Sequence, residues 1–159
     1  MRLARVSAVA AKVEADIARS ARHRRDLAGE RDALRRGRLH LQRLGTAAQA
    51  GGRVERAWRT VGTAEFTRAS GRSDPSMWLD AAQEWDGVAR PYLGALARWR
   101  AAEALIERDE PITAARVARE ALRTADALGS VWLVSEISAL SDHSGLELAL
   151  DGVSPEGRR

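Results

Sequence analysis

The 159-residue sequence contains no cysteine, only one lysine (Lys12), one tyrosine and one phenylalanine. Without cysteine the chain can form no disulfide, no thiol nucleophile and no cysteine-ligated zinc site. No apolar run approaches the roughly 20 residues that a membrane-spanning helix needs, so we expect no membrane association. The absence of cysteine is also typical of proteins from reducing compartments, and we therefore expect a cytoplasmic location.

Motifs for catalysis and phosphate binding are missing as well. The sequence has no GxxxxGK[ST] or GxGxxG phosphate loop, no HExxH zinc motif and no GxSxG nucleophile turn. The histidines are His23, His40 and His143, and no two of them have the spacing of metal ligands on one helix face. We therefore expect no catalytic residues, no cofactor and no metal, and we expect that the protein is not an enzyme.

Arginine supplies almost all of the positive charge. The chain has 26 basic and 22 acidic residues, but residues 1–44 contain 12 basic and 5 acidic ones, a net charge of +7. The remainder has 14 basic and 17 acidic residues, a net charge of −3. A basic segment can contact nucleic-acid phosphates or an acidic partner, although it is also typical of a solvated helix face. Nucleic-acid binding by residues 1–44 is therefore an alternative function.

Residues 2–44 have the apolar periodicity of a helix. One column of apolar residues lies at multiples of seven: Val6, Val13, Leu27, Leu34 and Leu41. A second column, Leu3, Ala10 and Ile17, continues with arginines, whereas a long coiled coil needs both columns to stay apolar. We expect a long basic helix over residues 1–44, continuous or broken near Gly29 or Gly37, packed along the first column on the rest of the domain. A coiled-coil dimer is the alternative.

Residues 53–150 have the pattern of helical hairpins. Helices over 91–107 and 112–128 are predicted to meet at the tight turn 109–111, and Gly129 has the position of a C-terminal cap. Pro75 and Pro111, each after a helix and a turn, lie 36 residues apart, and a period in the mid-thirties is typical of tetratricopeptide solenoids. We predict one all-α domain of stacked antiparallel hairpins, tetratricopeptide-like, with residues 151–159 as a disordered tail.

Five tryptophans are distributed over the predicted helices: Trp58, Trp78, Trp85, Trp99 and Trp132. Their helical spacing among apolar neighbours favours packing in the core. Trp78 and Trp132 lie in the first turns of their helices, so we expect them to be partly exposed and to be the candidate partner contacts. A small-ligand or substrate pocket between helices is a further alternative.

Residues 74–150 contain a series of motifs that resembles a known family. The series runs from Trp78 and Trp85 through Arg90-Pro91-Tyr92 and the ARWRxAEAL segment at 97–105 to the helix end at 125–130. It is similar to the segment that precedes the DNA-binding domain in large actinobacterial LuxR-family transcriptional regulators. The stretch Gly152-Val153-Ser154-Pro155-Glu156 resembles the start of that DNA-binding domain.

The resemblance implies a tetratricopeptide-like region that lies between an ATPase module and a helix-turn-helix domain. This sequence contains neither of those domains. It implies a non-enzymatic regulatory or protein-interaction module, whose partner is another protein or an adjacent domain. DNA would then be contacted only indirectly, through a domain that is missing here. The oligomeric state stays open.

Overall fold

The computed structural model describes residues 2–49, 51–146 and 148, and in this part of the chain it contains seven α-helices and no strand. The predicted all-α fold is therefore confirmed, whereas the predicted tail 151–159 lies outside the described residues. The helices are α1 (Arg2–His23), α2 (Leu27–Gln49), α3 (Arg53–Ala69), α4 (Pro75–Asp86), α5 (Pro91–Glu107), α6 (Pro111–Ala127) and α7 (Val131–Ser144).

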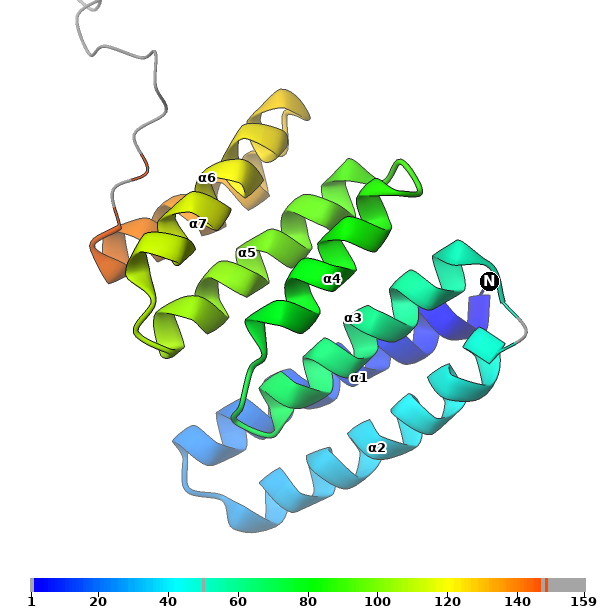
Figure 1. Ribbon diagram of the computed structural model, residues 1–159. Coiled ribbons are helices and arrows are strands. Elements are labelled where there is room, and N and C mark those ends of the chain that lie inside the picture. The colour runs from blue at the N-terminus through cyan, green and yellow to red at the C-terminus, as the bar shows by residue number, and fades with distance from the viewer. Residues whose placement is uncertain (1, 50, 147, 149–159) are drawn as a thin grey trace, which may run out of the picture.

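Successive helices run antiparallel and form one stack from α1 and α2 to α6 and α7 (Figure 1). The first three helices all contact one another, α4 packs between α3 and α5, and α7 packs against both α5 and α6. This arrangement of stacked hairpins is compatible with the predicted tetratricopeptide-like architecture. None of the helices described here combines the length and the apolarity that a bilayer crossing requires.

The C-terminal half repeats one turn. α5, α6 and α7 begin at intervals of 20 residues, and each is preceded by a residue with positive φ: Ala89 (54°), Asp109 (61°) and Gly129 (64°). In each turn the next residue donates its N–H to the carbonyl five residues back, which satisfies the carbonyls at the helix end. These bonds are Arg90 to Trp85, Glu110 to Leu105 and Ser130 to Ala125, each 2.9 Å. Only the third turn has the glycine that this conformation favours.

The N-terminal segment is a helical hairpin. Residues 1–44 were predicted to be helical, continuous or broken near Gly29 or Gly37; the structure has a break, but the chain reverses at residues 24–26, and both glycines lie inside α2. Arg25 has a φ of 58°, and the Asp26 carboxylate accepts a 2.9 Å hydrogen bond from the Gly29 N–H. An aspartate at this position caps a new helix, so the break depends on Asp26 and not on either glycine. The hairpin also excludes a continuous coiled coil over residues 2–44.

The face of α1 that packs on the domain is not the predicted column. Val6 is 63% and Val13 49% exposed, and Leu27 at the start of α2 is 63% exposed. The buried face of α1 consists of alanines that are at most 2% exposed: Ala4, Ala8, Ala11, Ala15 and Ala18. Small side chains let helix backbones approach closely, and a Cβ at Gly62 of α3 would lie only 3.7 Å from the Ala8 Cα. The close approach of the α1 and α3 backbones, and not the burial of large side chains, therefore determines which face of α1 is packed.

The largest hydrophobic cluster lies in the C-terminal half, from α3 to α7. Its large buried side chains include Trp78, Trp99, Val117, Leu133 and Ile137. The clusters around α1 and α2 are smaller and consist mainly of alanine. The core thus positions α4, α5 and α7 firmly, and these helices carry most of the tryptophans.

Candidate functional site

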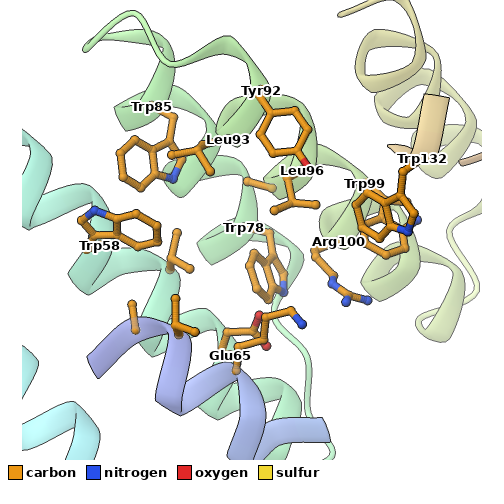
Figure 2. A pocket seen from close by; sticks show the side chains of 15 residues that line it. Trp58, Glu65, Trp78, Trp85, Tyr92, Leu93, Leu96, Trp99, Arg100 and Trp132 are labelled. Carbon is orange, nitrogen blue, oxygen red and sulfur yellow. The ribbon is translucent and has the colours of Figure 1, made fainter. Parts of the chain in front are cut away.

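A groove of about 250 Å³ lies between α1, α3 and α5, with α4 as its floor and α7 at one end (Figure 2). We call it the aromatic groove. Its lining comprises Ala8, Val9 and Lys12 of α1, Trp58, Val61 and Glu65 of α3, Trp78 and Trp85 of α4, Tyr92, Leu93, Leu96, Ala97, Trp99 and Arg100 of α5, and Trp132 of α7.

Helical periodicity brings the aromatic residues to one side. Trp78 and Trp85 lie seven residues apart on α4, and Tyr92, Leu96 and Trp99 follow at spacings of four and three on α5, so each set shares a helix face. Since α4 packs between α3 and α5, its two tryptophans point into the space between these helices (Figure 2). The groove therefore forms only when the helices pack together, and it combines residues that are far apart in the sequence.

Edge-to-face contacts hold the tryptophans in place. The ring centroids of Trp58 and Trp85 are 4.8 Å apart at an interplanar angle of 76°, and those of Trp99 and Trp132 are 5.7 Å apart at 85°. Aromatic pairs prefer this geometry, which contributes about 0.5–1.5 kcal/mol beyond the buried area. These two contacts orient four of the six aromatic side chains that line the groove.

The two tryptophans predicted as partner contacts lie in different environments. Trp78 is only 2% exposed and donates its Nε1–H to Ser73 Oγ at 3.2 Å, so the prediction that it is partly exposed is wrong. It forms part of the floor because α4 is covered on both sides. Trp132 is 52% exposed, as expected for a first-turn residue, and it lines the groove. Its contact with a partner stays a prediction.

Tyr92 was not among the predicted contacts, although it lines the groove and is 40% exposed. It is the second residue of α5, as Trp132 is the second residue of α7, 40 positions later. The repeated turn thus places an aromatic side chain at the same point of two helices. The equivalent positions of Tyr92 and Trp132 could have identified Tyr92 from the sequence, but only once the helices are known to begin every 20 residues.

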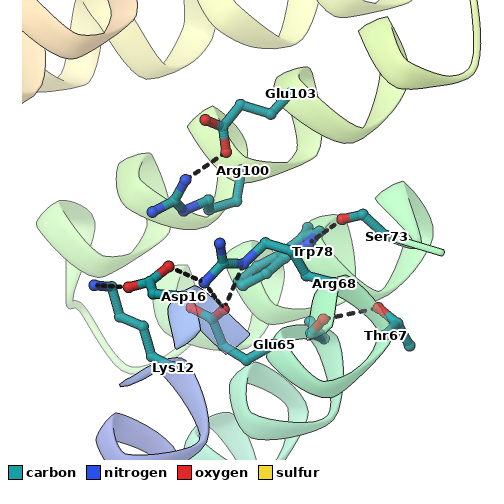
Figure 3. Close-up of polar contacts among 10 residues, drawn as sticks. Lys12, Asp16, Glu65, Thr67, Arg68, Ser73, Trp78, Arg100 and Glu103 are labelled. Atoms are coloured by element: carbon teal, nitrogen blue, oxygen red, sulfur yellow. Dashed lines mark hydrogen bonds and ion pairs between the residues drawn. The ribbon is translucent and has the colours of Figure 1, made fainter. Parts of the chain in front are cut away.

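A charged network lies where α1 meets α3 beside the groove (Figure 3). Arg68 donates from Nε to Glu65 Oε2 and from Nη2 to Asp16 Oδ1, each at 2.7 Å. The Arg68 and Glu65 side chains are each 4% exposed, whereas Asp16 is 49% exposed and also pairs with Lys12. The Arg68 Nη1 is buried without a hydrogen-bond partner. The network therefore ties the N-terminal hairpin to α3 through one nearly buried cation.

The two carboxylates of this network have opposite pKa shifts. Burial alone would raise the pKa of Asp16, but the hydrogen bond and charge of Arg68, together with Lys12, outweigh it and lower the pKa. Burial raises the pKa of Glu65 above its usual value in spite of the attraction of Arg68 and Arg100. Asp16 thus stays ionised more readily than Glu65, and it is the better counter-ion for Arg68.

Two basic side chains, Arg100 and Lys12, line the groove. The Arg100 guanidinium lies 4.1 Å from the centroid of the Trp99 ring, which is a cation–π contact, and it also pairs with Glu103. Lys12 lies on the opposite wall, on α1. The groove thus combines an apolar, aromatic interior with basic groups on two of its walls.

A second basic surface lies on α2. Arg31, Arg35 and Arg38 are all exposed, and their spacing of four and three residues places them on one outer face of the helix. Arg35 pairs with Asp32 at 3.0 Å, and both of these side chains are more than half exposed. Salt bridges between exposed side chains are weak, so Arg35 remains available to an anionic ligand.

The groove and the arginine face of α2 are the candidate binding surfaces of the described residues. In the described ranges no three His, Asp or Glu side chains are placed to hold a metal ion. Further hollows of 330, 360 and 340 Å³ on the surface are lined chiefly by polar and charged residues. Comparison with known proteins identified no matching family model, no matching curated protein and no matching solved structure.

Proposed function

We propose that the chain is a non-enzymatic, cytoplasmic protein-interaction module that binds an apolar segment of a partner protein or adjacent domain in the aromatic groove. The observation that carries this proposal is the groove itself, which has six aromatic rings among its lining side chains. Tryptophan, tyrosine and arginine are enriched at the energetic centres of protein interfaces. Rings that are already held by edge-to-face contacts lose little entropy on binding.

A protein segment suits the groove better than a small molecule does. Its volume of about 250 Å³ lies below the usual range of about 300–1,000 Å³ for ligand pockets. Tyr92 and Trp132 are partly exposed at 40% and 52%, so a partner would bury further aromatic surface there. Lys12 and Arg100 would orient acidic groups of that partner.

The resemblance to LuxR-family regulators supports a regulatory role. In that family the corresponding helical region lies between an ATPase module and a DNA-binding domain. The proposed module would transmit a signal by holding another domain or protein, and DNA would be reached only indirectly, through that domain or protein.

Site-specific photo-crosslinking in the cell that produces the chain tests the proposal. A photoreactive amino acid at Tyr92 should capture a partner protein, and the same amino acid at Ile112, which is 87% exposed on α6, should not. Binding of the purified partner should then weaken at least tenfold in Trp132→Ala, about 1.4 kcal/mol or more. Equal capture at both positions, or unchanged affinity in Trp132→Ala, would contradict the proposal.

Nucleic-acid binding is the second candidate, and the arginine face of α2 is the observation that favours it. If phosphates bind there, the affinity for duplex DNA should fall steeply with salt concentration, and Arg31→Gln/Arg38→Gln should reduce the slope by about two. Arg116→Gln/Arg123→Gln on α6 is the matched control, since both residues are exposed. No DNA binding at low salt would exclude this function.

A further inference from the structure

The outer face of α1 is apolar and uncovered. Leu3, Val6, Val9, Val13 and Ile17 are exposed by 58, 63, 48, 49 and 39%. We call these five residues the valine stripe. The opposite face of the same helix, which α2 and α3 cover, consists chiefly of alanine, with Ser7 and Glu14 also buried there. Because removing large aliphatic side chains from water is favourable, a helix that exposes its large residues leaves this free energy for a partner.

Four residues of the valine stripe, together with Ala10, have the spacing of a helix-pairing seam. Leu3, Val6, Ala10, Val13 and Ile17 alternate by three and four residues, which is the pattern of helices that pack side by side. The small Ala10 stands at the centre, with branched residues on both sides. An antiparallel copy of the same seam would therefore place Ala10 near Ala10, Val6 near Val13 and Leu3 near Ile17.

We propose that the valine stripe binds the valine stripe of a second copy of this chain, as an antiparallel helix pair with a two-fold axis near Ala10. The stripe is distinct from the aromatic groove, with which it shares only Val9. A two-fold contact uses the same surface on both copies, as closed protein dimers generally do.

The charges beside the stripe favour the antiparallel direction. Lys12 lines the groove, Asp16 pairs with it across one turn, and Arg5 lies two turns before Lys12 on the same flank. In the antiparallel pair Arg5 of each copy faces Asp16 of the other. A parallel pair would instead place this flank of one copy against the opposite flank of the other, so that Arg5 and Asp16 would not meet. Charge complementarity thus favours a second copy in the antiparallel direction.

Analytical ultracentrifugation over about 5–500 µM tests the dimer, since one helix pair is smaller than a standard interface and should dissociate in this range. The wild type should change from a mass of 17.3 kDa to twice that value. Val13→Glu should remain monomeric throughout, and Ile112→Glu on α6 should dimerise like the wild type. Circular dichroism verifies that both variants stay helical. A wild type that is monomeric at every concentration, or a Val13→Glu variant that still dimerises, overturns the proposal.

Disulfide trapping tests the geometry, because the chain has no cysteine of its own. Ala10→Cys should form a covalent dimer under mild oxidation, since a disulfide needs Cα atoms about 4.4–6.8 Å apart and the two-fold axis brings this residue close to its copy. Ile112→Cys should stay monomeric. Mixing Leu3→Cys with Ile17→Cys should give the mixed dimer, whereas a prevalence of Leu3→Cys homodimers would show the parallel arrangement. A monomer that binds phosphatidylserine vesicles through Val13 would assign the stripe to a membrane and also overturn the proposal.

Discussion

α1 and α7 are the first and the last helix of the stack in chain order, and they place most of their large apolar side chains in opposite ways. In α7, Leu133 and Ile137 are fully buried, and the exposed positions after its first turn include Ser135 and Asp142. In α1 most of the buried positions are alanines, and the five residues of the valine stripe are exposed. Terminal repeats of a solenoid usually carry a polar outer face. Beyond the first turn of α7, where Val131 is 82% and Trp132 52% exposed, the large apolar side chains of that helix are at least partly buried, whereas those of α1 are exposed as at an interface.

The largest effect is expected where α1 is tied to α3. Arg68→Met would leave Glu65, whose side chain is 4% exposed, without its counter-ion, and should destabilise the fold by about 3–5 kcal/mol. The double variant Glu65→Leu/Arg68→Met removes both buried charges and should recover most of the loss. Urea denaturation measures both free energies of unfolding. A double variant as unstable as the single one would show that packing, and not the uncompensated charge, is responsible.

The contrast between the two ends can be measured with one residue type. Ile137→Ala in α7 should cost about 2–5 kcal/mol, because this side chain is fully buried. Ile17→Ala in α1, where the side chain is 39% exposed, should change the stability of the monomer by less than about 0.5 kcal/mol. Both free energies of unfolding should be measured at a low protein concentration, at which the proposed dimer dissociates. Equal costs at the two sites would mean that the valine stripe is packed within the monomer.

Close approach in the N-terminal half can be tested with two glycines. A Cβ at Gly62 would lie 2.3 Å from Cδ1 of the fully buried Leu44, so Gly62→Ala should destabilise by about 1–3 kcal/mol. Gly45 in α2 has no atom within 4 Å of that position, and Gly45→Ala should stabilise by about 0.5–1 kcal/mol. Thermal unfolding of both variants gives the sign of each change. A neutral Gly62→Ala would show that α2 and α3 separate easily.

The smallest effect concerns the pH dependence of the charged network. Asp16 has a lowered pKa, so its stabilisation is present above the ordinary aspartate pKa of about 3.9 and is lost as the pH falls below it. Glu65 has a raised pKa, so its contribution is present below about 4.3 and is lost as the pH rises through the raised pKa. Asp16→Asn should therefore weaken the loss of unfolding free energy that occurs as the pH falls below about 3.9. Glu65→Gln should weaken the loss that occurs as the pH rises above about 4.3. Denaturation between pH 3 and 7 should show these two opposite changes, and changes of the same sign would contradict the shifts.

Much of the fold follows from local signals. Pro75, Pro91 and Pro111 each begin a helix at the predicted position, because proline fixes φ and needs no partner for its missing N–H there. The break lies at Asp26 and not near Gly29 or Gly37, because a capping aspartate starts a new helix there, whereas a glycine is tolerated inside α2. For the candidate site, the first-turn position of Trp132 was informative, whereas the same position gave the wrong exposure for Trp78, which neighbouring helices cover.

The sequence by itself determined that the chain is helical, where most of its helices begin and that its tryptophans lie on shared helix faces, because these properties depend on residues within a few turns. Only the tertiary structure decided which face of α1 is buried, which rings line the groove and which side chains are left at the surface. Those outcomes depend on how closely helices from distant parts of the chain approach, and small residues such as Ala8 and Gly62 set that distance without leaving a periodic signal of large hydrophobic residues.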